Sequence, residues 1–276
     1  ACFMNKLKKI IFIFSFSIFL PQKILIPMNE EQNDHLKAYG IAFSSLKNNN
    51  TINWLLNYKG GSFLLDLDSR VEKNCTLRGV TYYKVSGSQI NTIYKTIEEN
   101  NMEIVLLEKI PKIAVYSPPD KQPWDDAVTL ALTYAEIDYD TIFDDEVLSG
   151  ELSNYDWLHL HHEDFTGQYG KFYKSYGKKP WYIKMKSDSE RFAIKNNFNT
   201  VHELKKEIAF RIKNYIINGG FLFAMCSATD SFDIALAAYN IDIASEVFDG
   251  TPIDQNYSTK LNFSNSIAFE NYSLYT

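Results

Sequence analysis

A cysteine at the end of an apolar run has the best position in this sequence for nucleophilic chemistry. Residues 219–238 read GGFLFAMCSATDSFDIALAA, which predicts a buried strand over 221–225, a turn over 226–229 that begins with Cys226, and a helix over 230–239. Ligands of open α/β sheets bind at the carboxyl ends of the strands, and a helix N-terminus stabilises a thiolate. A backbone amide such as that of Ser227 would serve an oxyanion hole and contact the substrate. The pattern predicts a nucleophilic Cys226, and the alternative is a buried structural cysteine.

Histidines gather at the end of a second predicted strand, over 156–161. The sequence from 159 to 164 reads HLHHED. Because side chains alternate along a strand, we expect His159 and His161 on one face and His162 on the other. If this strand ends at the same sheet edge as the strand of Cys226, its histidines would lie near the thiol.

Three uses of this histidine cluster remain open. His159 or His161 could be the base for Cys226, with Glu163 among the catalytic residues and His162 contacting the substrate. Alternatively, His159, His161 and one of the two following acids could bind a divalent metal. In the third interpretation the histidines only order the following loop through hydrogen bonds.

A loop after another predicted strand, over 112–117, is expected at the same sheet edge. It contains Trp124 and Asp125, which are candidate substrate-binding residues. Asp125 could instead cap the helix predicted over 124–137. Asp230 and Asp233, near the start of the helix after Cys226, are interpreted as acids that compensate the helix dipole.

The elements that must position these residues alternate along the chain, which predicts an α/β fold built on parallel sheets. We divide it into two α/β units, over 23–108 and 109–276. Residues 163–187 show no clear periodicity, and 266–275 is interpreted as a strand region. The remaining predicted strands cover 23–27, 52–58, 62–67, 80–85 and 139–143, and the remaining predicted helices cover 30–46, 88–100 (with Ser88 as N-cap) and 201–218.

The composition narrows the functional classes. The chain has 276 residues, of which 45% are hydrophobic, so it can bury a substantial core. Its formal net charge of -6 argues against a nucleic-acid partner, which would require a basic face. The three cysteines show no zinc-motif spacing. We predict a small-molecule or peptide ligand and no cofactor, and the sequence leaves the oligomeric state open.

The N-terminal residues have the layout of a secretory signal peptide. Lys6, Lys8 and Lys9 precede an uncharged apolar run over 10–20, and Pro21 ends that run. The run is shorter than the roughly 20 residues of a membrane span. We therefore expect residues 1–22 to be a signal with a few upstream residues, and the protein to be periplasmic or secreted. An uncleaved anchor is the alternative, and no other membrane span is expected.

The strand–cysteine–helix arrangement over 109–238 resembles the class I glutamine amidotransferase-like superfamily. That resemblance implies a flavodoxin-like three-layer sandwich and a cysteine that attacks an amide or ester. The family's turn is usually G-x-C-x-G, whereas residues 224–228 here read AMCSA. The family's catalytic histidine follows its cysteine, but the last histidine of this chain is His202. The domain over 109–276 is therefore expected to be C-terminally incomplete.

Most of the chain also resembles an uncharacterised exported bacterial family whose members often carry the label asparagine synthetase B. Glutamine-dependent asparagine synthetases need an N-terminal cysteine nucleophile and an S-G-G-x-D-S loop, and neither occurs here, which argues against that activity. The phrases that carry the resemblance are ILIPMNEEQNDHLKAYGIA, WLLNYKGGSFLL, PKIAVYSPPDKQPWDDAVTLALTYAEI, YDWLHLHHEDFTGQYGKFY and GGFLFAMCSATDSFDIALAA.

Three functions remain open from the sequence. The first is an exported hydrolase with Cys226 as nucleophile. The second is a periplasmic protein that binds a ligand on the same fold without catalysis. The third is a metal-dependent hydrolase built on His159 and His161.

Overall fold

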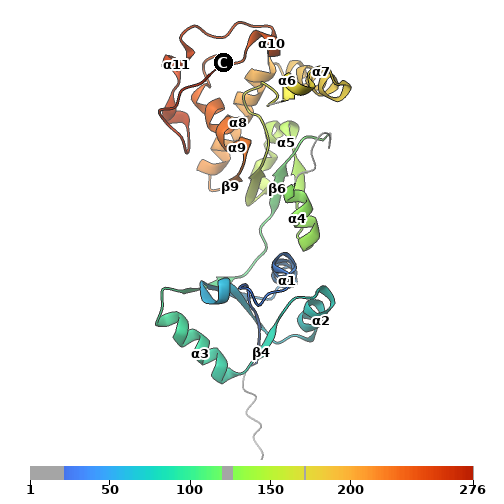
Figure 1. Cartoon of the computed structure of the whole chain (residues 1–276), viewed down its shortest axis with the longest axis vertical. Helices are drawn as coiled ribbons and strands as arrows, with labels where there is room; N and C mark the ends of the chain where they lie inside the picture. The colour runs from blue at the N-terminus through green and yellow to red at the C-terminus, as the bar shows by residue number, and fades with distance from the viewer. Residues whose placement is uncertain (1–21, 120–126, 171, 276) are drawn as a thin grey trace, which may run out of the picture. The chain divides into compact units, whose positions relative to one another are not determined.

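The computed structural model describes residues 22–119, 127–170 and 172–275. The chain forms two compact units, which meet in sequence between Glu108 and Lys109 (Figure 1). The fold is mixed α/β, as predicted, but the two units contain different kinds of sheet.

The first unit contains a five-stranded sheet in which every pairing is antiparallel, so the predicted parallel sheet is wrong for this half of the chain. The reason is visible between β2 and β3, which are joined by the short 3₁₀ turn Tyr58–Gly60. Parallel neighbours need a crossover of a dozen or more residues, and a connection this short therefore forces an antiparallel hairpin. The strand order is β4-β1-β3-β2-β5. The strands are β1 (Lys23–Ile26), β2 (Ile52–Leu56), β3 (Ser62–Asp66), β4 (Tyr83–Val85) and β5 (Glu103–Leu107).

Gly60 is required at this hairpin for two reasons. Its φ is 79°, in the left-handed region that favours glycine. A Cβ at this position would also collide with the backbone carbonyl of Met28. The Gly60–Gly61 pair therefore marks a tight turn, which falls between the strands predicted over 52–58 and 62–67.

Among the described residues of the first unit there are three α-helices, and two of them were predicted. Asp34 caps α1 by accepting from the Lys37 amide. Ser86 and Gln89 form a capping box, so α3 begins earlier than the predicted N-cap at Ser88. The sequence did not predict α2 or β5. The helices are α1 (His35–Lys47), α2 (Ser69–Arg78) and α3 (Gly87–Glu98).

The second unit contains a parallel sheet of four strands, which confirms the coarse prediction of a parallel α/β layer. Its central strand β6 is buried along its whole length, as expected for a strand with helices on both faces. The order is β7-β6-β8-β9. The strands are β6 (Ile113–Tyr116), β7 (Asp140–Ile142), β8 (Trp157–Leu160) and β9 (Phe221–Ala224).

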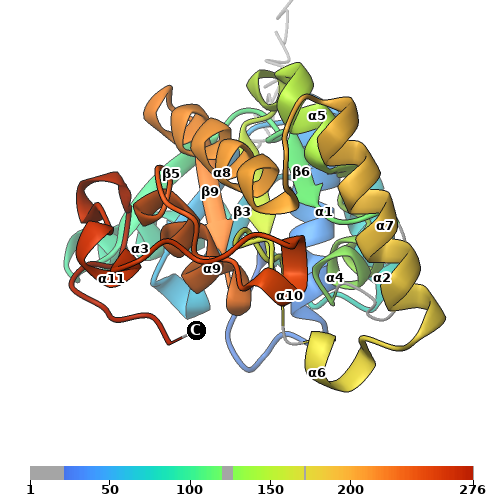
Figure 2. The same cartoon turned by 90° about the horizontal axis from the view of Figure 1, so that it is seen from above.

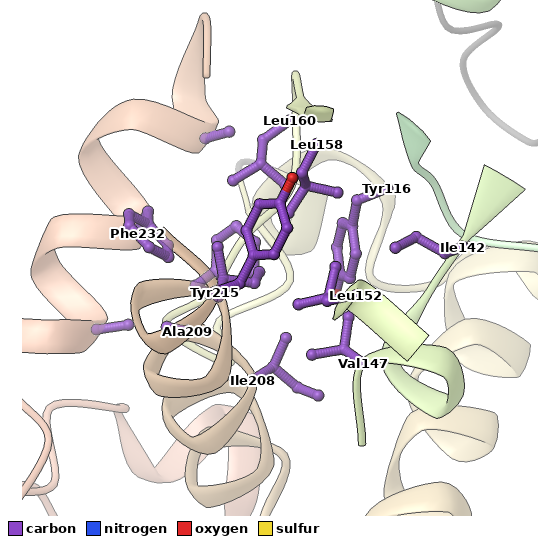
Figure 3. Packing of buried hydrophobic residues seen from close by; sticks show 14 of the residues in the cluster. Tyr116, Ile142, Val147, Leu152, Leu158, Leu160, Ile208, Ala209, Tyr215 and Phe232 are labelled. Carbon is purple, nitrogen blue, oxygen red and sulfur yellow. The ribbon is translucent and has the colours of Figure 1, made fainter. Parts of the chain in front are cut away.

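Alternate residues of β6 belong to different hydrophobic clusters. Ile113 and Val115 pack with Leu132 of α4. Ala114 and Tyr116 belong to the larger cluster in Figure 3, which joins the sheet to α5, α8 and α9. The helices α8 and α9 lie side by side in Figures 1 and 2. The helices of this unit are α4 (Ala127–Ala135), α5 (Asp144–Ser149), α6 (Phe172–Tyr176), α7 (Pro180–Lys195), α8 (Val201–Ile217), α9 (Ser227–Ala237), α10 (Glu246–Asp249) and α11 (Tyr257–Lys260), with 3₁₀ turns at Glu151–Asn154 and Phe263–Asn265.

Two segments of the second unit differ from the sequence interpretation. Residues 163–187 contain α6 and the first turns of α7, which Pro180 opens at a position where its missing amide hydrogen costs nothing. Within the described part of 266–275 no strand forms. Instead, the buried carboxylate of Asp233 accepts from three successive backbone amides of that segment, so Asp233 holds the C-terminal segment rather than compensating a helix dipole.

Among the described residues, no helix is long and apolar enough to span a membrane. The predicted signal peptide over 1–22 falls almost wholly outside those residues.

Candidate active site

Hydrogen bonds between β8, β9 and the chain just beyond them bring the predicted histidines to the cysteine. Leu160 pairs with Ala224, and its carbonyl accepts from the Met225 amide at 3.1 Å. The next carbonyl, that of His161, accepts from the Ala228 amide at 3.2 Å. The Ser227 hydroxyl donates to the His162 carbonyl at 3.2 Å. Because the strands run parallel and in register, both segments leave the sheet together.

The backbone of Cys226 adopts a conformation that is rare for a residue with a side chain. Its φ is 55° and its ψ is -139°. Such a conformation costs about 1–3 kcal/mol and is found mostly at functional sites. The helix α9 starts at Ser227 rather than at the predicted 230, so only Met225 and Cys226 lie between strand and helix. The side chain is exposed.

Three side chains meet at this turn. His161, His162 and Cys226 each offer a nitrogen or sulfur atom, and these three atoms lie within 4.8 Å of one another. The two imidazole rings are stacked, with centroids 3.5 Å apart. His161 is buried, whereas His162 and Cys226 are exposed. The predicted opposition of His161 and His162 is wrong because β8 ends at Leu160, and the alternation of a strand stops there.

His159 and Glu163 lie beside this group rather than in it. The His159 ring is buried and stacks on Phe223 of β9, with centroids 5.5 Å apart. The Glu163 carboxylate accepts from the His161 amide at 2.7 Å. The Glu163 carbonyl accepts from the Ser231 hydroxyl of α9 at 2.7 Å. Glu163 therefore fixes the backbone around His161, and the structure does not gather the metal set predicted from His159, His161 and an acid.

The first amides of α9 differ in what they bind. The Ala228 amide is used by the His161 carbonyl, and the Thr229 amide donates to the Cys226 carbonyl at 3.3 Å. Within the described chain, the Ser227 amide donates to no protein acceptor. It follows the thiol directly, so it is the donor that a negatively charged oxygen beside Cys226 would use.

Two further candidates cannot be placed at this site. Trp124 and Asp125 lie outside the described residues. Two hollows of the described chain lie away from Cys226. One of about 520 Å³ is lined by Asp156 and Gly220, which precede β8 and β9, so it lies at the opposite edge of the sheet from Cys226. Another, of about 430 Å³, lies in the first unit beside Asp66 and Asp68.

A buried polar network at the end of β6 was missed by sequence reasoning. The Lys205 ammonium lies 2.8 Å from each Asp144 carboxylate oxygen and 2.9 Å from the Tyr116 hydroxyl. The Tyr116 hydroxyl also donates to Asp144. Burial, and then the Asp144 charge, hold the pKa of Tyr116 well above its usual value. The available signal was the helical spacing of Lys205, four residues after buried Val201.

Comparisons of the chain with protein-family models, with curated proteins and with solved structures find no match.

Proposed function

We propose that this protein is a hydrolase or acyl-transfer enzyme in which Cys226 attacks the carbonyl carbon of an amide or ester. The observation that carries the proposal is the strained backbone of an exposed cysteine between a parallel strand and a helix, with two imidazoles within 4.8 Å of its sulfur. A sharp strand-to-helix turn of this kind exposes a nucleophile above the sheet. A cysteine with only a structural role would not need this conformation.

His161 is the better candidate for the base. Its side chain is buried, and its backbone is held on both sides by the Glu163 carboxylate and the Ala228 amide. A base held in one orientation loses little entropy when the substrate binds. His162 is exposed and stacked on His161, which suits a residue that contacts the substrate. A separation of up to 4.8 Å from sulfur is within the range that shortens when a substrate binds.

The proposed reaction follows from these positions. The imidazole of His161 takes the thiol proton of Cys226, and the sulfur forms a bond to the carbonyl carbon. The oxyanion accepts a hydrogen bond from the Ser227 amide. The carbon–nitrogen or carbon–oxygen bond then breaks, and the leaving group takes the proton from His161. Water, or another acyl acceptor, attacks the thioester and restores the thiol.

The test compares the purified protein with its Cys226→Ala and His161→Asn variants on a panel of p-nitrophenyl esters and primary amides. We expect both variants to lose at least about 100-fold in kcat/KM on any substrate turned over. Cys75→Ala is the matched control, since Cys75 is buried in the first unit. Turnover that survives in Cys226→Ala would overturn the proposal. Ligand binding without turnover in the wild type would instead support the non-catalytic binding function.

Two wider proposals accompany this one. The four-stranded parallel order, with helices on both faces of β6, supports a flavodoxin-like three-layer arrangement for the second unit. The basic and apolar pattern over 6–20 supports export. Fractionation of expressing cells and sequencing of the mature N-terminus test the export proposal. A protein that remains in the cytoplasm with its first residues intact would contradict it.

A further inference from the structure

We propose that His161, His162 and Cys226 bind a thiophilic divalent metal ion, with Zn²⁺ as the representative, and that the bound ion blocks the thiol. The inhibitory consequence rests on the proposed function, because a thiolate bound to metal cannot attack a carbonyl. The binding itself is independent of any catalysis. It differs from the sequence prediction, which placed a metal on His159, His161 and an acid.

The geometry of the three side chains is close to that of a metal site. Ligand atoms around a tetrahedral zinc ion lie about 3.3–3.7 Å apart, given metal–ligand distances of about 2.0–2.3 Å. Here the three candidate atoms are within 4.8 Å of one another. A contraction of about 1 Å, by rotation of the side chains, would bring the three atoms to these separations. His162 and Cys226 are exposed, so neighbouring atoms oppose little of that rotation.

The backbone that supports the three ligands is already ordered. The Ala228 amide holds the His161 carbonyl, the Ser227 hydroxyl holds the His162 carbonyl, and the Glu163 carboxylate holds the His161 amide. The ligands therefore come from two neighbouring segments that are hydrogen-bonded to each other. Such preorganisation lowers the entropy lost on binding.

The chemistry of the ligands selects the metal. Two imidazoles and one thiolate favour zinc, copper or cobalt over magnesium and calcium, which prefer oxygen. Two histidines and a cysteine also leave a fourth position open for water or an anion. On binding, the sulfur–hydrogen bond breaks and the proton passes to the buffer, while both imidazoles coordinate as neutral bases. Affinity should therefore fall as the pH is lowered.

A single base would be enough for the proposed reaction, yet two stacked imidazoles face the thiol. The proposed reaction uses one imidazole as its base and leaves the second only to contact the substrate. A metal site accounts for both rings, since each supplies one nitrogen.

The experiment uses the full chain, freed of metal by a chelator, and titrates Co²⁺ and then Zn²⁺ in competition with a chromophoric chelator. We expect one equivalent of cobalt to give tetrahedral visible bands and a thiolate-to-cobalt charge-transfer band. Cys226→Ser should abolish the charge-transfer band. Cys226→Ser and His162→Asn should each weaken zinc binding by about 100-fold or more, because three ligands become two.

The controls are His35→Asn, which removes an imidazole from the first unit, and Cys75→Ala, which removes a buried thiol. Both should bind zinc as the wild type does. His162 is exposed, so its variant keeps the test valid if Cys226→Ser folds poorly, and circular dichroism checks both. Zinc affinity unchanged in Cys226→Ser and His162→Asn, or cobalt spectra without a thiolate band, would overturn the metal site.

Activity separates this inference from the proposed function. If the metal-free enzyme is active and stoichiometric zinc abolishes turnover reversibly, both stand. If zinc binds at these residues but the metal-free protein turns over no substrate, the metal site stands and the nucleophile proposal fails. If the metal-free enzyme is active and zinc at stoichiometric concentration leaves it unchanged, the inhibitory site is overturned while the nucleophile stands.

Discussion

The two cysteines that the structure describes have opposite surroundings. Cys75 is fully buried in α2, and burial raises the pKa of its thiol to about 11. Cys226 is exposed at the first turn of α9. Only a thiolate reacts rapidly with alkylating reagents, so the two side chains should be distinguished by chemistry alone.

We predict that iodoacetamide labels Cys226 and spares Cys75 in the folded protein. A Cys2→Ser background removes the third thiol. The expected stoichiometry, measured by mass spectrometry, is one label per chain in native buffer and two in denaturant. Peptide mapping should place the native label on Cys226. Equal labelling of both cysteines before unfolding would contradict the assignment of their environments.

The ion pair between Lys205 and Asp144 is buried, with side-chain exposures of 10% and 6%. Removing one partner of such a pair leaves a buried charge and costs about 3–5 kcal/mol, whereas replacing both with apolar residues costs much less. We predict that Lys205→Met lowers the free energy of unfolding by this amount and that Lys205→Met with Asp144→Leu recovers most of it. Urea unfolding of the wild type, both single variants and the double variant completes a double-mutant cycle, which measures the coupling between the two residues. A double variant that loses the sum of the single losses would show that the pair is not coupled.

Single residues were predictable from the sequence where they follow an uninterrupted strand. Cys226 and Ser227 lie where the apolar run 221–225 places them. The direction in which the His162 side chain points, relative to that of His161, was not predictable. The end of β8 at Leu160 is set by pairing with β9 and not by the local sequence. Lys205 was missed because a charged residue on a helix is normally solvated.

One carboxylate of α9 accepts three of the hydrogen bonds that join this helix to the segment after α11. Asp233 is 1% exposed and accepts from the amides of Ile267, Ala268 and Phe269. Hydrogen bonds to a charged acceptor contribute about 1.5–3 kcal/mol each. Asp233 is therefore a main attachment of the C-terminal segment, beside the hydrogen bond from the Tyr272 hydroxyl to the Asp233 carbonyl.

We predict that Asp233→Asn releases the C-terminal segment while leaving the sheet intact. An amide side chain has one oxygen acceptor where the carboxylate has two, so at least one of the three backbone amides loses its partner. Hydrogen exchange at residues 267–269 should accelerate by about tenfold or more, since tenfold corresponds to 1.4 kcal/mol. Asp230→Asn, at an exposed position of the same helix, is the control. Unchanged exchange in Asp233→Asn would contradict this role.

A buried histidine joins two loops that flank α8. His202 lies with Nδ1 2.6 Å from the Thr166 carbonyl and Nε2 3.2 Å from the Ile241 carbonyl. Burial, and then the charge of Lys206, lower the pKa of His202 below 6.5. The carboxylate of Asp242, 3.8 Å away, opposes this shift only in part.

We predict that His202 makes the protein less stable in mild acid. Because the pKa of His202 is lower in the folded state, the unfolded chain takes up a proton first as the pH falls through about 6.5. The stabilisation is complete above that range and is lost below it. Urea unfolding between pH 7.5 and 5.5 should show a smaller decline in His202→Gln than in the wild type. The same decline in both would contradict the assignment.

Whether a segment forms a strand or a helix was more predictable than which strands pair with each other and in which direction. The strands β1, β2 and β3 all lie close to the predicted ranges. Their antiparallel pairing differs from the predicted parallel pairing. Alternation of strands with helices suggested crossovers, whereas the hairpin at Gly60–Gly61 decides the direction of β3 and depends on the close approach of Met28.

The whole chain shows why the two halves differ in predictability. The second unit alternates short apolar strands with helices, a pattern typical of parallel sheets. The strands of the first unit are of similar length, but a three-residue 3₁₀ turn joins β2 to β3. Its buried residues include an aliphatic cluster between the sheet and α3 and a second set in α1, such as Ile41 and Phe43. Composition alone gave a globular protein with a real core, and both units have one.

At position 226, selection for stability and selection for the chemistry of a thiol favour different residues. The backbone strain there is present in every folded molecule, and removing the Cβ relieves it, at an entropic cost of about 0.5–1 kcal/mol. We expect Cys226→Gly to be at least as stable as Cys226→Ala, as measured by thermal unfolding. A library randomised at position 226 and selected only for heat resistance should therefore fill with glycine, and one selected for the chemistry of the thiol should return to cysteine. Enrichment of alanine over glycine in the first library would show that the backbone there is relaxed.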